Sequence, residues 1–171
     1  MTYTYEMNDL FLRRLIKDTT LPPCQNETLL VAFCMEHQKE IPILSDYPFI
    51  VEYEYVPDNG STNPGKGDLI LTNSIRNYLI VEVKYLTQAT GKSAVNRRKY
   101  QRKKVKEQVT KYLDQFRLEF PTTLVDGLAL TNEVLCKKLR DEFEVFKQLK
   151  IINWEKRKKS LYPKNRKKLV T

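Results

Sequence analysis

GKGDLILTNSIRNYLIVEVKYL, residues 65–86, consists of two apolar runs on either side of a polar turn, with Asp68, Glu82 and Lys84 placed within the runs. Side chains alternate between the two faces of a β-strand, so Glu82 and Lys84 share one face while Val83 takes the other. A turn centred on Ile75 places Asp68 directly opposite Glu82, with Cβ atoms about 4.5–5.5 Å apart. The sequence therefore predicts a hairpin with two carboxyl groups and one ammonium group on the same face.

Two carboxylates this close repel each other, and an unpaired buried charge costs about 3–5 kcal/mol. A divalent cation reverses the sign of that interaction. Mg²⁺ commonly takes one or two protein carboxylates, and Mn²⁺ accepts similar oxygen ligands. Asp68 and Glu82 are therefore candidate metal ligands, with the backbone carbonyl of Val83 as a further oxygen. Lys84 is the candidate group for orienting the attacking water or stabilising the transition state.

A less specific interpretation stays open, in which Asp68 and Glu82 are solvated residues at strand ends and Lys84 forms a weak ion pair with Glu82.

Apolar periodicity and turn residues predict an α/β protein around this hairpin. Helical spacing places Met7, Leu10, Phe11 and Leu15 on the apolar side of the first helix. The expected elements, in chain order, are helices at 5–17 and 25–39, strands at 48–56, 67–72 and 78–85, a helix at about 105–120, a strand at 124–132 and a final helix over 135–149. A helix between the last two strands predicts that they are parallel, in a mixed central sheet flanked by helices.

The strand at 48–56 alternates along its length, so we expect Phe49, Val51, Tyr53 and Tyr55 on one face. Glu52 and Glu54 then lie on the solvated face.

The spacing of Asp68 from the triplet EVK at 82–84 resembles the PD-(D/E)xK nuclease superfamily. That resemblance implies a restriction-endonuclease-like αβββαβ core over about residues 24–132, with extra N- and C-terminal helices. It also implies catalytic and Mg²⁺-binding roles for Asp68 and Glu82, and a catalytic role for Lys84. Gly67 stands where the name of the motif expects proline.

Two further positions match members of the superfamily that resemble RecB-type nucleases or archaeal Holliday-junction resolvases. Glu27, in the helix before the strands, matches a site glutamate and is a candidate catalytic residue and metal ligand. Gln108 and Tyr112, in QVTKY at 108–112, match a glutamine-tyrosine pair, which makes Gln108 a candidate catalytic residue. Glu27 could instead simply favour its helix N-terminus, and the pair could be a helix surface and a core aromatic.

Basic residues concentrate in two blocks within a chain of 171 residues and net charge +9. RRKYQRKKVK, residues 97–106, contains no acidic residue, and EKRKKSLYPKNRKK, residues 155–168, contains one. Such blocks are typical of polyanion contacts, although solvated helix faces and disordered tails have the same composition. The candidate nucleic-acid contacts are Arg97, Arg98, Lys99, Arg102, Lys103, Lys104 and Tyr112. Tyr100 is expected to pack rather than stack on a base.

We expect a single domain over residues 1–154, followed by a basic C-terminal tail at 155–171. The N-terminal residues lack the features of a signal or transit peptide, and no apolar run reaches the length of a membrane span. Cys24, Cys34 and Cys136 form no metal-site or disulfide pattern. An intracellular protein is expected, and the basic tail is compatible with the nucleus.

The favoured function is a Mg²⁺-dependent nuclease, with endonucleolytic cleavage of DNA as the expected activity. A non-catalytic nucleic-acid-binding module of the same fold, serving a larger complex, is the first alternative. An interaction protein that acts through its basic tail is the second. A homodimer or a partner subunit is compatible with each of these functions.

Overall fold

The computed structural model describes residues 4–21, 25–55, 67–74 and 76–161. The helices and strands of this part follow in the order α1 (Tyr5–Asp18), α2 (Asn26–Glu36), the 3-10 turns η1 (Gln38–Glu40) and η2 (Leu44–Asp46), β1 (Phe49–Tyr55), β2 (Gly67–Thr72), β3 (Asn77–Lys84), α3 (Lys92–Glu119), β4 (Leu124–Thr131) and α4 (Lys137–Leu161). Cys24, Ile75 and residues 162–171 of the basic tail lie outside the described part.

The strands form a mixed sheet in the order β1-β2-β3-β4. β1 pairs with β2 and β2 with β3 in antiparallel fashion, whereas β4 runs parallel to β3. The predicted α/β class, the element order from α2 to β4 and the parallel last pair are therefore confirmed.

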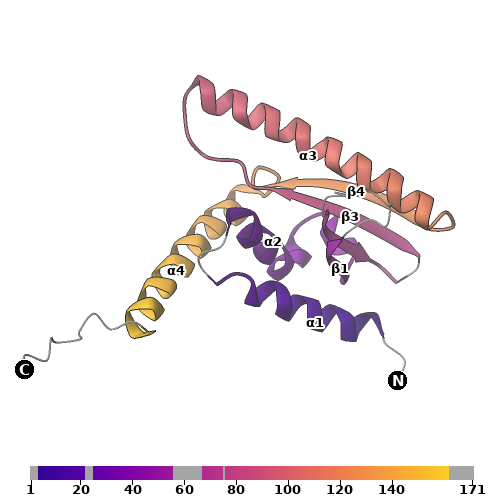
Figure 1. The fold of residues 1–171 in the computed structure, drawn as a ribbon, viewed down its shortest axis with the longest axis horizontal. Coiled ribbons are helices and arrows are strands. Elements are labelled where there is room, and N and C mark those ends of the chain that lie inside the picture. The colour runs from indigo at the N-terminus through magenta and orange to yellow at the C-terminus, as the bar shows by residue number, and fades with distance from the viewer. Residues whose placement is uncertain (1–3, 22–24, 56–66, 75, 162–171) are drawn as a thin grey trace, which may run out of the picture.

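Helices cover both faces of this sheet. Figure 1 shows α3 along one face, while α1 and α2 lie on the other. The core between the sheet and α3 is built around Ile70, Ile80, Tyr112, Phe116 and Val125. The larger core on the opposite side joins α1, α2, α4 and the other face of the strands.

The hairpin has the predicted register. Leu69 pairs with Val81 and Leu71 with Leu79, so paired residue numbers sum to 150 as expected from a turn centred on Ile75. Ile70 and Ile80 contact the α3 side, while Leu71 and Leu79 pack in the other core. Alternation therefore decides which hairpin side chains lie under α3.

The predicted facing of β1 is wrong because the strand contains a β-bulge. Its pairing shifts between Ile50, opposite Leu71, and Glu52, opposite Ile70. The extra residue changes the alternation, so Val51 packs on the α3 side and Tyr53 on the opposite side. The side chain of Tyr55 lies outside the described part, and Glu52 and Glu54 are exposed as expected.

The predicted apolar side of α1 is also wrong. Met7, Leu10, Phe11 and Leu15 are exposed, with 70% of Leu10 accessible, whereas α1 buries Asp9, Leu12 and Ile16. The helix lies with this second side against the body of the protein. The polar side chains on this side of α1 take part in a network of hydrogen bonds there.

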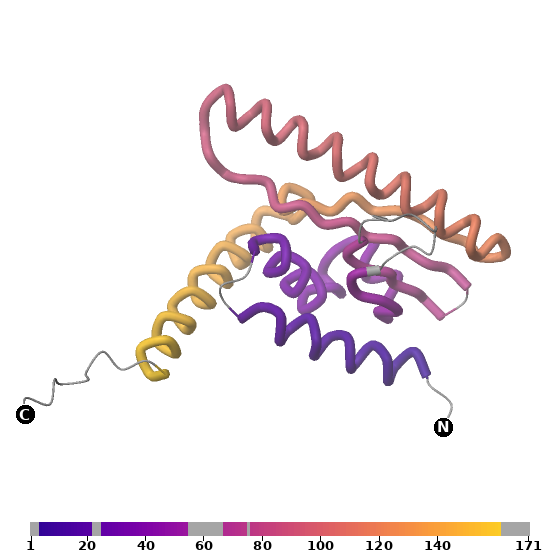
Figure 2. Tube along the Cα trace, in the orientation of Figure 1, coloured from indigo at the N-terminus to yellow at the C-terminus, as the bar shows by residue number. Residues whose placement is uncertain are grey.

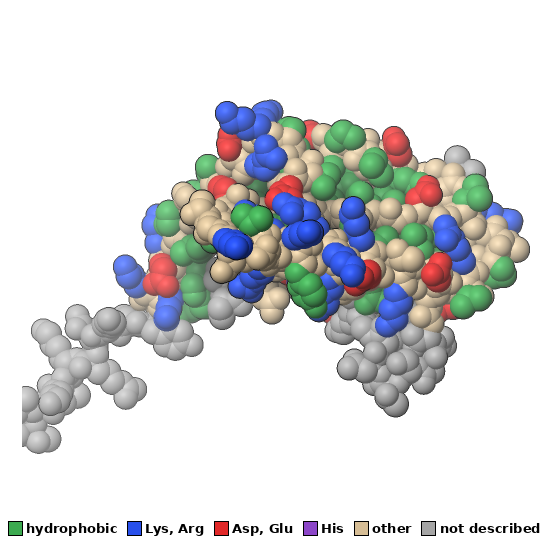
Figure 3. Space-filling model, turned by 90° about the horizontal axis from the view of Figure 1, so that it is seen from above, with side chains coloured by type: hydrophobic (Ala, Val, Ile, Leu, Met, Phe, Trp, Pro, Cys, Tyr) green, Lys and Arg blue, Asp and Glu red, His purple; other side chains and the backbone are tan. Residues whose placement is uncertain are grey.

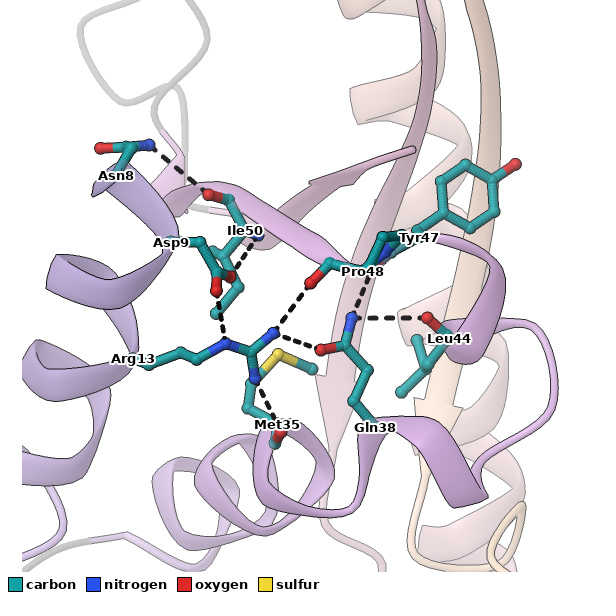
Figure 4. A network of polar contacts seen from close by, with 9 residues as sticks. All are labelled: Asn8, Asp9, Arg13, Met35, Gln38, Leu44, Tyr47, Pro48 and Ile50. Atoms are coloured by element: carbon teal, nitrogen blue, oxygen red, sulfur yellow. Dashed lines mark hydrogen bonds and ion pairs between the residues drawn. The ribbon is translucent and has the colours of Figure 1, made fainter. Parts of the chain in front are cut away.

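That network joins α1 to the start of the sheet (Figure 4). Asp9 accepts hydrogen bonds of 2.8 Å from the backbone N–H of Ile50 and from Nε of Arg13. Arg13 also donates to the carbonyl oxygens of Met35 and Pro48, and to the side-chain oxygen of Gln38. The buried carboxylate is thereby paired and fully engaged, which makes its burial tolerable.

The last two helices are longer than the sequence predicts. α3 begins at Lys92, so the basic block at 97–106 is helical throughout. α4 continues to Leu161, and the first part of the segment assigned to the basic tail is therefore helical. Figure 2 shows α4 running away from the sheet, and its residue Leu149 is 53% exposed. None of the described helices has both the length and the apolar character required to cross a bilayer.

Candidate active site

Asp68 and Glu82 lie on the α3 face of the hairpin, two residues from Ile70 and Ile80 respectively. The Asp68 carboxylate accepts a hydrogen bond of 2.5 Å from the backbone N–H of Val83. Glu82 is only 5% exposed. Neighbouring strands thus bring two carboxyl groups together in a largely buried position.

The electrostatics of this pair reflect burial and mutual repulsion. Burial raises the pKa of Glu82 to about 8, and the charge of Asp68 raises it too, against the opposing influence of the Asp68 backbone N–H and of Lys84. Burial likewise raises the pKa of Asp68 to about 6, opposed by its hydrogen bond with Val83. Both groups therefore need a nearby positive charge to be stable as carboxylates.

Lys84 and Glu27 form an ion pair beside the two carboxyl groups. The Lys84 Nζ lies 2.6 Å from Glu27 Oε1, with 28% and 35% of the respective side chains exposed. Glu27 comes from the first turn of α2, and Lys84 is the last residue of β3. The charge of Glu27 raises the pKa values of Asp68 and Glu82, and the charge of Lys84 lowers them. The four groups therefore form one electrostatic cluster.

The chemistry of this cluster fits a divalent cation. Glu82 Oε2 is buried and has no hydrogen-bond partner among the residues that the structure describes. A cation would give this oxygen a partner and offset the repulsion from Asp68. Because the N–H of Val83 faces Asp68, its carbonyl faces the same neighbouring strand and could add an oxygen ligand.

Among residues 4–21, 25–55, 67–74 and 76–161, no group of three or more His, Cys, Asp or Glu side chains is arranged to hold a metal. The candidate centre therefore consists of two carboxylates and a carbonyl, which is within the usual range for Mg²⁺. Glu27, a candidate ligand from the sequence, forms an ion pair with Lys84 in this structure.

Helix α3 brings Tyr112 to the cluster, and Gln108 lies on the same helix. Tyr112 is 3% exposed, and its pKa is raised by burial and by the charges of Glu82 and Asp68. Gln108 is half-buried one helical turn earlier. In the described part of the chain, no hydrogen bond joins Gln108 to Asp68 or Glu82.

Several cations of the basic block bind parts of their own chain. Arg98 donates to the carbonyl oxygens of Thr87 and Ala89, at 3.1 and 2.6 Å, and so holds the loop that precedes α3. Arg102 forms two hydrogen bonds of 2.8 and 2.7 Å with the Glu133 carboxylate. These two arginines stabilise the fold, which the sequence did not reveal.

The remaining cations of the block are exposed. Lys103 lies 3.5 Å from Glu107 in an exposed ion pair of the same helix. Arg97, Lys99 and Lys104 have no ion pair or hydrogen bond with any other described residue. Figure 3 looks onto this side of the molecule and shows Lys and Arg side chains spread over it, with Asp and Glu among them.

A polar groove of about 510 Å³ lies beside the Lys84–Glu27 pair. Its walls include Asn26 and Glu27 of α2, Tyr85 and Thr87 after β3, and Arg97 and Gln101 of α3.

Sequence reasoning missed Gln101. The signal was its helical spacing. Polar or aromatic residues recur there at steps of three or four and therefore lie along one side of α3, namely Arg97, Gln101, Lys104, Gln108 and Tyr112.

Comparisons with known proteins add no assignment. The chain matches no protein-family model, and neither the curated proteins nor the solved structures contain a match to it. The functional argument therefore depends on the geometry and chemistry of the cluster around Asp68 and Glu82.

Proposed function

We propose that this protein is a metal-dependent nuclease that hydrolyses phosphodiester bonds, with DNA as the favoured substrate and a restriction-endonuclease-like fold. The observation that carries the proposal is the buried Glu82 Oε2 without a hydrogen-bond partner, on the same sheet face as the Asp68 carboxylate. A buried carboxylate pair with an unused oxygen supplies the ligand chemistry that Mg²⁺ prefers, and Mn²⁺ is expected to substitute for it.

Each group then has a distinct role. Asp68, Glu82 and the Val83 carbonyl would hold the cation, which when bound acidifies a water molecule and neutralises charge on the phosphoryl oxygens. Lys84 is placed to orient a water or to stabilise negative charge that develops in the transition state. Glu27, 2.6 Å from the Lys84 Nζ, keeps that ammonium group in position.

The exposed cations of α3 support a polyanionic substrate. Arg97, Lys99 and Lys104 have no partner among the described residues, so their charges are available to phosphate groups. Contacts to phosphates position a nucleic acid without reading its sequence. The proposed nuclease should therefore show little base-sequence preference.

The test is cleavage of circular duplex and of linear single-stranded DNA with Mg²⁺, with Mn²⁺ and with EDTA. We expect cleavage by the wild type with either metal and none in EDTA. Asp68→Asn and Lys84→Met should each lower the rate by about 100-fold or more. Asp141→Asn, at an exposed position of α4, should retain the wild-type rate. Equal cleavage by wild type and Lys84→Met would exclude the proposed role of Lys84.

The exposed basic side of α3 also favours a second candidate function, a non-catalytic nucleic-acid-binding module. Its phosphate contacts do not require Asp68 or Glu82. Binding that persists in EDTA and in Asp68→Asn, without cleavage by the wild type under any condition, would select this function.

A function carried by the tail predicts a different outcome. Removal of residues 162–171, which leaves α4 intact, should then abolish partner binding, whereas a nuclease should still cut.

A further inference from the structure

The groove beside the Lys84–Glu27 pair has an unusual lining for a small-molecule pocket. Such pockets are mostly apolar, whereas this groove is lined by amide, hydroxyl, phenol, carboxylate and guanidinium groups. Glu27 belongs both to the groove wall and to the ion pair with Lys84. A ligand in the groove would therefore lie directly next to the phosphate that the site is proposed to cleave.

Gln101 supplies a buried acceptor that no other described residue uses. Its Oε1 has no hydrogen-bond partner in the described part of the chain, although an unsatisfied buried polar atom typically costs about 1–3 kcal/mol. Across the groove, the Asn26 side chain has no hydrogen bond within the described chain. Two amides thus offer both donors and acceptors to a ligand, as the edge of an unpaired nucleobase requires.

Tyr100 adds an exposed aromatic ring on α3, beside the groove residue Gln101 in the sequence. It directly precedes Gln101, is 66% exposed and has no ring contact with another described residue, contrary to the expectation that it packs. Arg97 and Lys104 lie three and four residues away on the same helix, close enough to contact the phosphates on either side of a stacked base. Base stacking on such a ring is a common mode of single-strand binding.

We propose that the groove and Tyr100 together hold an unpaired nucleotide next to the scissile phosphate, so that the enzyme selects single-stranded or unpaired segments over duplex. This inference rests on the proposed nuclease function. In a duplex the base edges are paired and the rings are stacked on their neighbours, so neither Gln101 nor Tyr100 can reach them without unpairing. A free phosphate would use Arg97 but would leave the Gln101 acceptor unsatisfied, because a phosphate presents acceptors to it.

The test compares binding of one labelled oligonucleotide, alone and annealed to its complement, by fluorescence anisotropy in EDTA at fixed ionic strength. We expect the wild type to bind the single strand at least tenfold more tightly. Gln101→Leu and Tyr100→Leu should each weaken single-strand binding by about 5-fold or more and leave duplex binding unchanged. Tyr100→Phe keeps the ring and should retain the preference.

Gln148→Leu, at an exposed position on α4, is the matched control for Gln101→Leu and should behave as the wild type. A single strand whose bases are replaced by abasic sites should bind wild type, Gln101→Leu and Tyr100→Leu equally. That result would identify the bases as the group recognised.

The outcomes separate this inference from the proposed function. The inference is overturned if the wild type binds single strand and duplex with equal affinity. It is also overturned if Gln101→Leu and Tyr100→Leu keep the preference for the single strand. Both conclusions hold even if Mg²⁺-dependent cleavage is observed. The inference is supported if both variants lose the preference for single strand over duplex. If the same wild type cuts no substrate with any metal, the nuclease proposal fails and the groove stands as a single-strand binding site.

Discussion

Glu82 links the folding of the hairpin to the proposed chemistry. The residue is 5% exposed, one of its carboxyl oxygens has no hydrogen-bond partner in the described chain, and its pKa is raised by burial and by Asp68. A folded chain without a cation therefore favours the protonated form of this side chain. A cation that replaces the proton makes the ionised form acceptable, which couples metal binding to pH.

We predict a pH-dependent stability difference between the wild type and Glu82→Gln in EDTA. In the unfolded chain the group loses its proton near its ordinary pKa of 4.5, while in the folded chain the pKa is raised to about 8. The folded state thus binds more protons between these values, so wild-type stability should fall as the pH rises from about 5 to 8. Glu82→Gln lacks this titrating group, so its stability should fall less over the same pH range.

Urea denaturation at pH 5, 6.5 and 8 measures this difference. Mg²⁺ should recover most of the wild-type stability that is lost at pH 8 and leave Glu82→Gln unchanged. Parallel pH profiles for the two proteins would contradict the assignment of Glu82 as a buried carboxyl group with a raised pKa.

Among the elements, α3 brings Tyr112 to the cluster because the helix lies close to β4. A Cβ atom at Gly127 would overlap the side chains of Val109 and Leu113, so the strand and the helix can approach this closely only with glycine there. The same helix carries Tyr112, Tyr100 and Gln101. The position of α3 thus affects both the candidate active site and the groove.

Gly127→Val should destabilise the protein by about 1–3 kcal/mol, since the new side chain must displace Val109 or Leu113 in a packed core. The free energy of unfolding from urea denaturation checks this value. Leu124→Val, at an exposed position at the start of the same strand, is the control and should change stability by less than about 0.5 kcal/mol. A neutral Gly127→Val variant would contradict the close packing of α3 on β4.

The basic side of α3 should determine the salt dependence of nucleic-acid binding. We predict that the double variant Arg97→Gln, Lys104→Gln lowers the magnitude of the slope of log affinity against log salt by about 1 to 2. The double variant Lys17→Gln, Lys39→Gln removes the same charge from exposed positions outside α3 and should change the slope much less. Equal slopes for the two double variants would place the phosphate contacts elsewhere.

At the scale of the whole molecule, one polar network attaches α1 to the rest of the protein. Arg13 connects α1 with the end of α2, with η1 through Gln38, and with the residue before β1. Asp9 joins the same helix to the backbone of β1. Distant parts of the chain therefore depend on one largely buried ion pair.

Arg13→Met should destabilise the protein by about 3–5 kcal/mol, because Asp9 is left as a buried charge without its partner. Urea denaturation provides the measurement. Arg14→Met, at the exposed neighbouring position, should change stability by less than about 0.5 kcal/mol. A double Asp9→Leu, Arg13→Met variant should recover part of the loss, and equal effects of Arg13→Met and Arg14→Met would refute the importance of the network.

Strand periodicity predicted the register of the hairpin, because one face must be apolar and a slip of one residue would reverse every side chain. The same rule failed in β1, where the bulge near Ile50 shifts the alternation by one residue. It failed in α1 for another reason. Apolar spacing favoured the side with Leu10 and Phe11, but hydrogen bonds allow Asp9 to be buried instead.

Local periodicity and short turns specify the α/β order of elements, the hairpin register and the shared face of Asp68 and Glu82, so these features could be predicted from the amino-acid sequence. The packed fold was needed to reveal the ion pair of Glu27 with Lys84, the binding of Arg98 and Arg102 to their own chain, and the place of Gln101 in a groove. These contacts join residues from different elements. Their partners depend on how helices pack on the sheet, which no local pattern encodes.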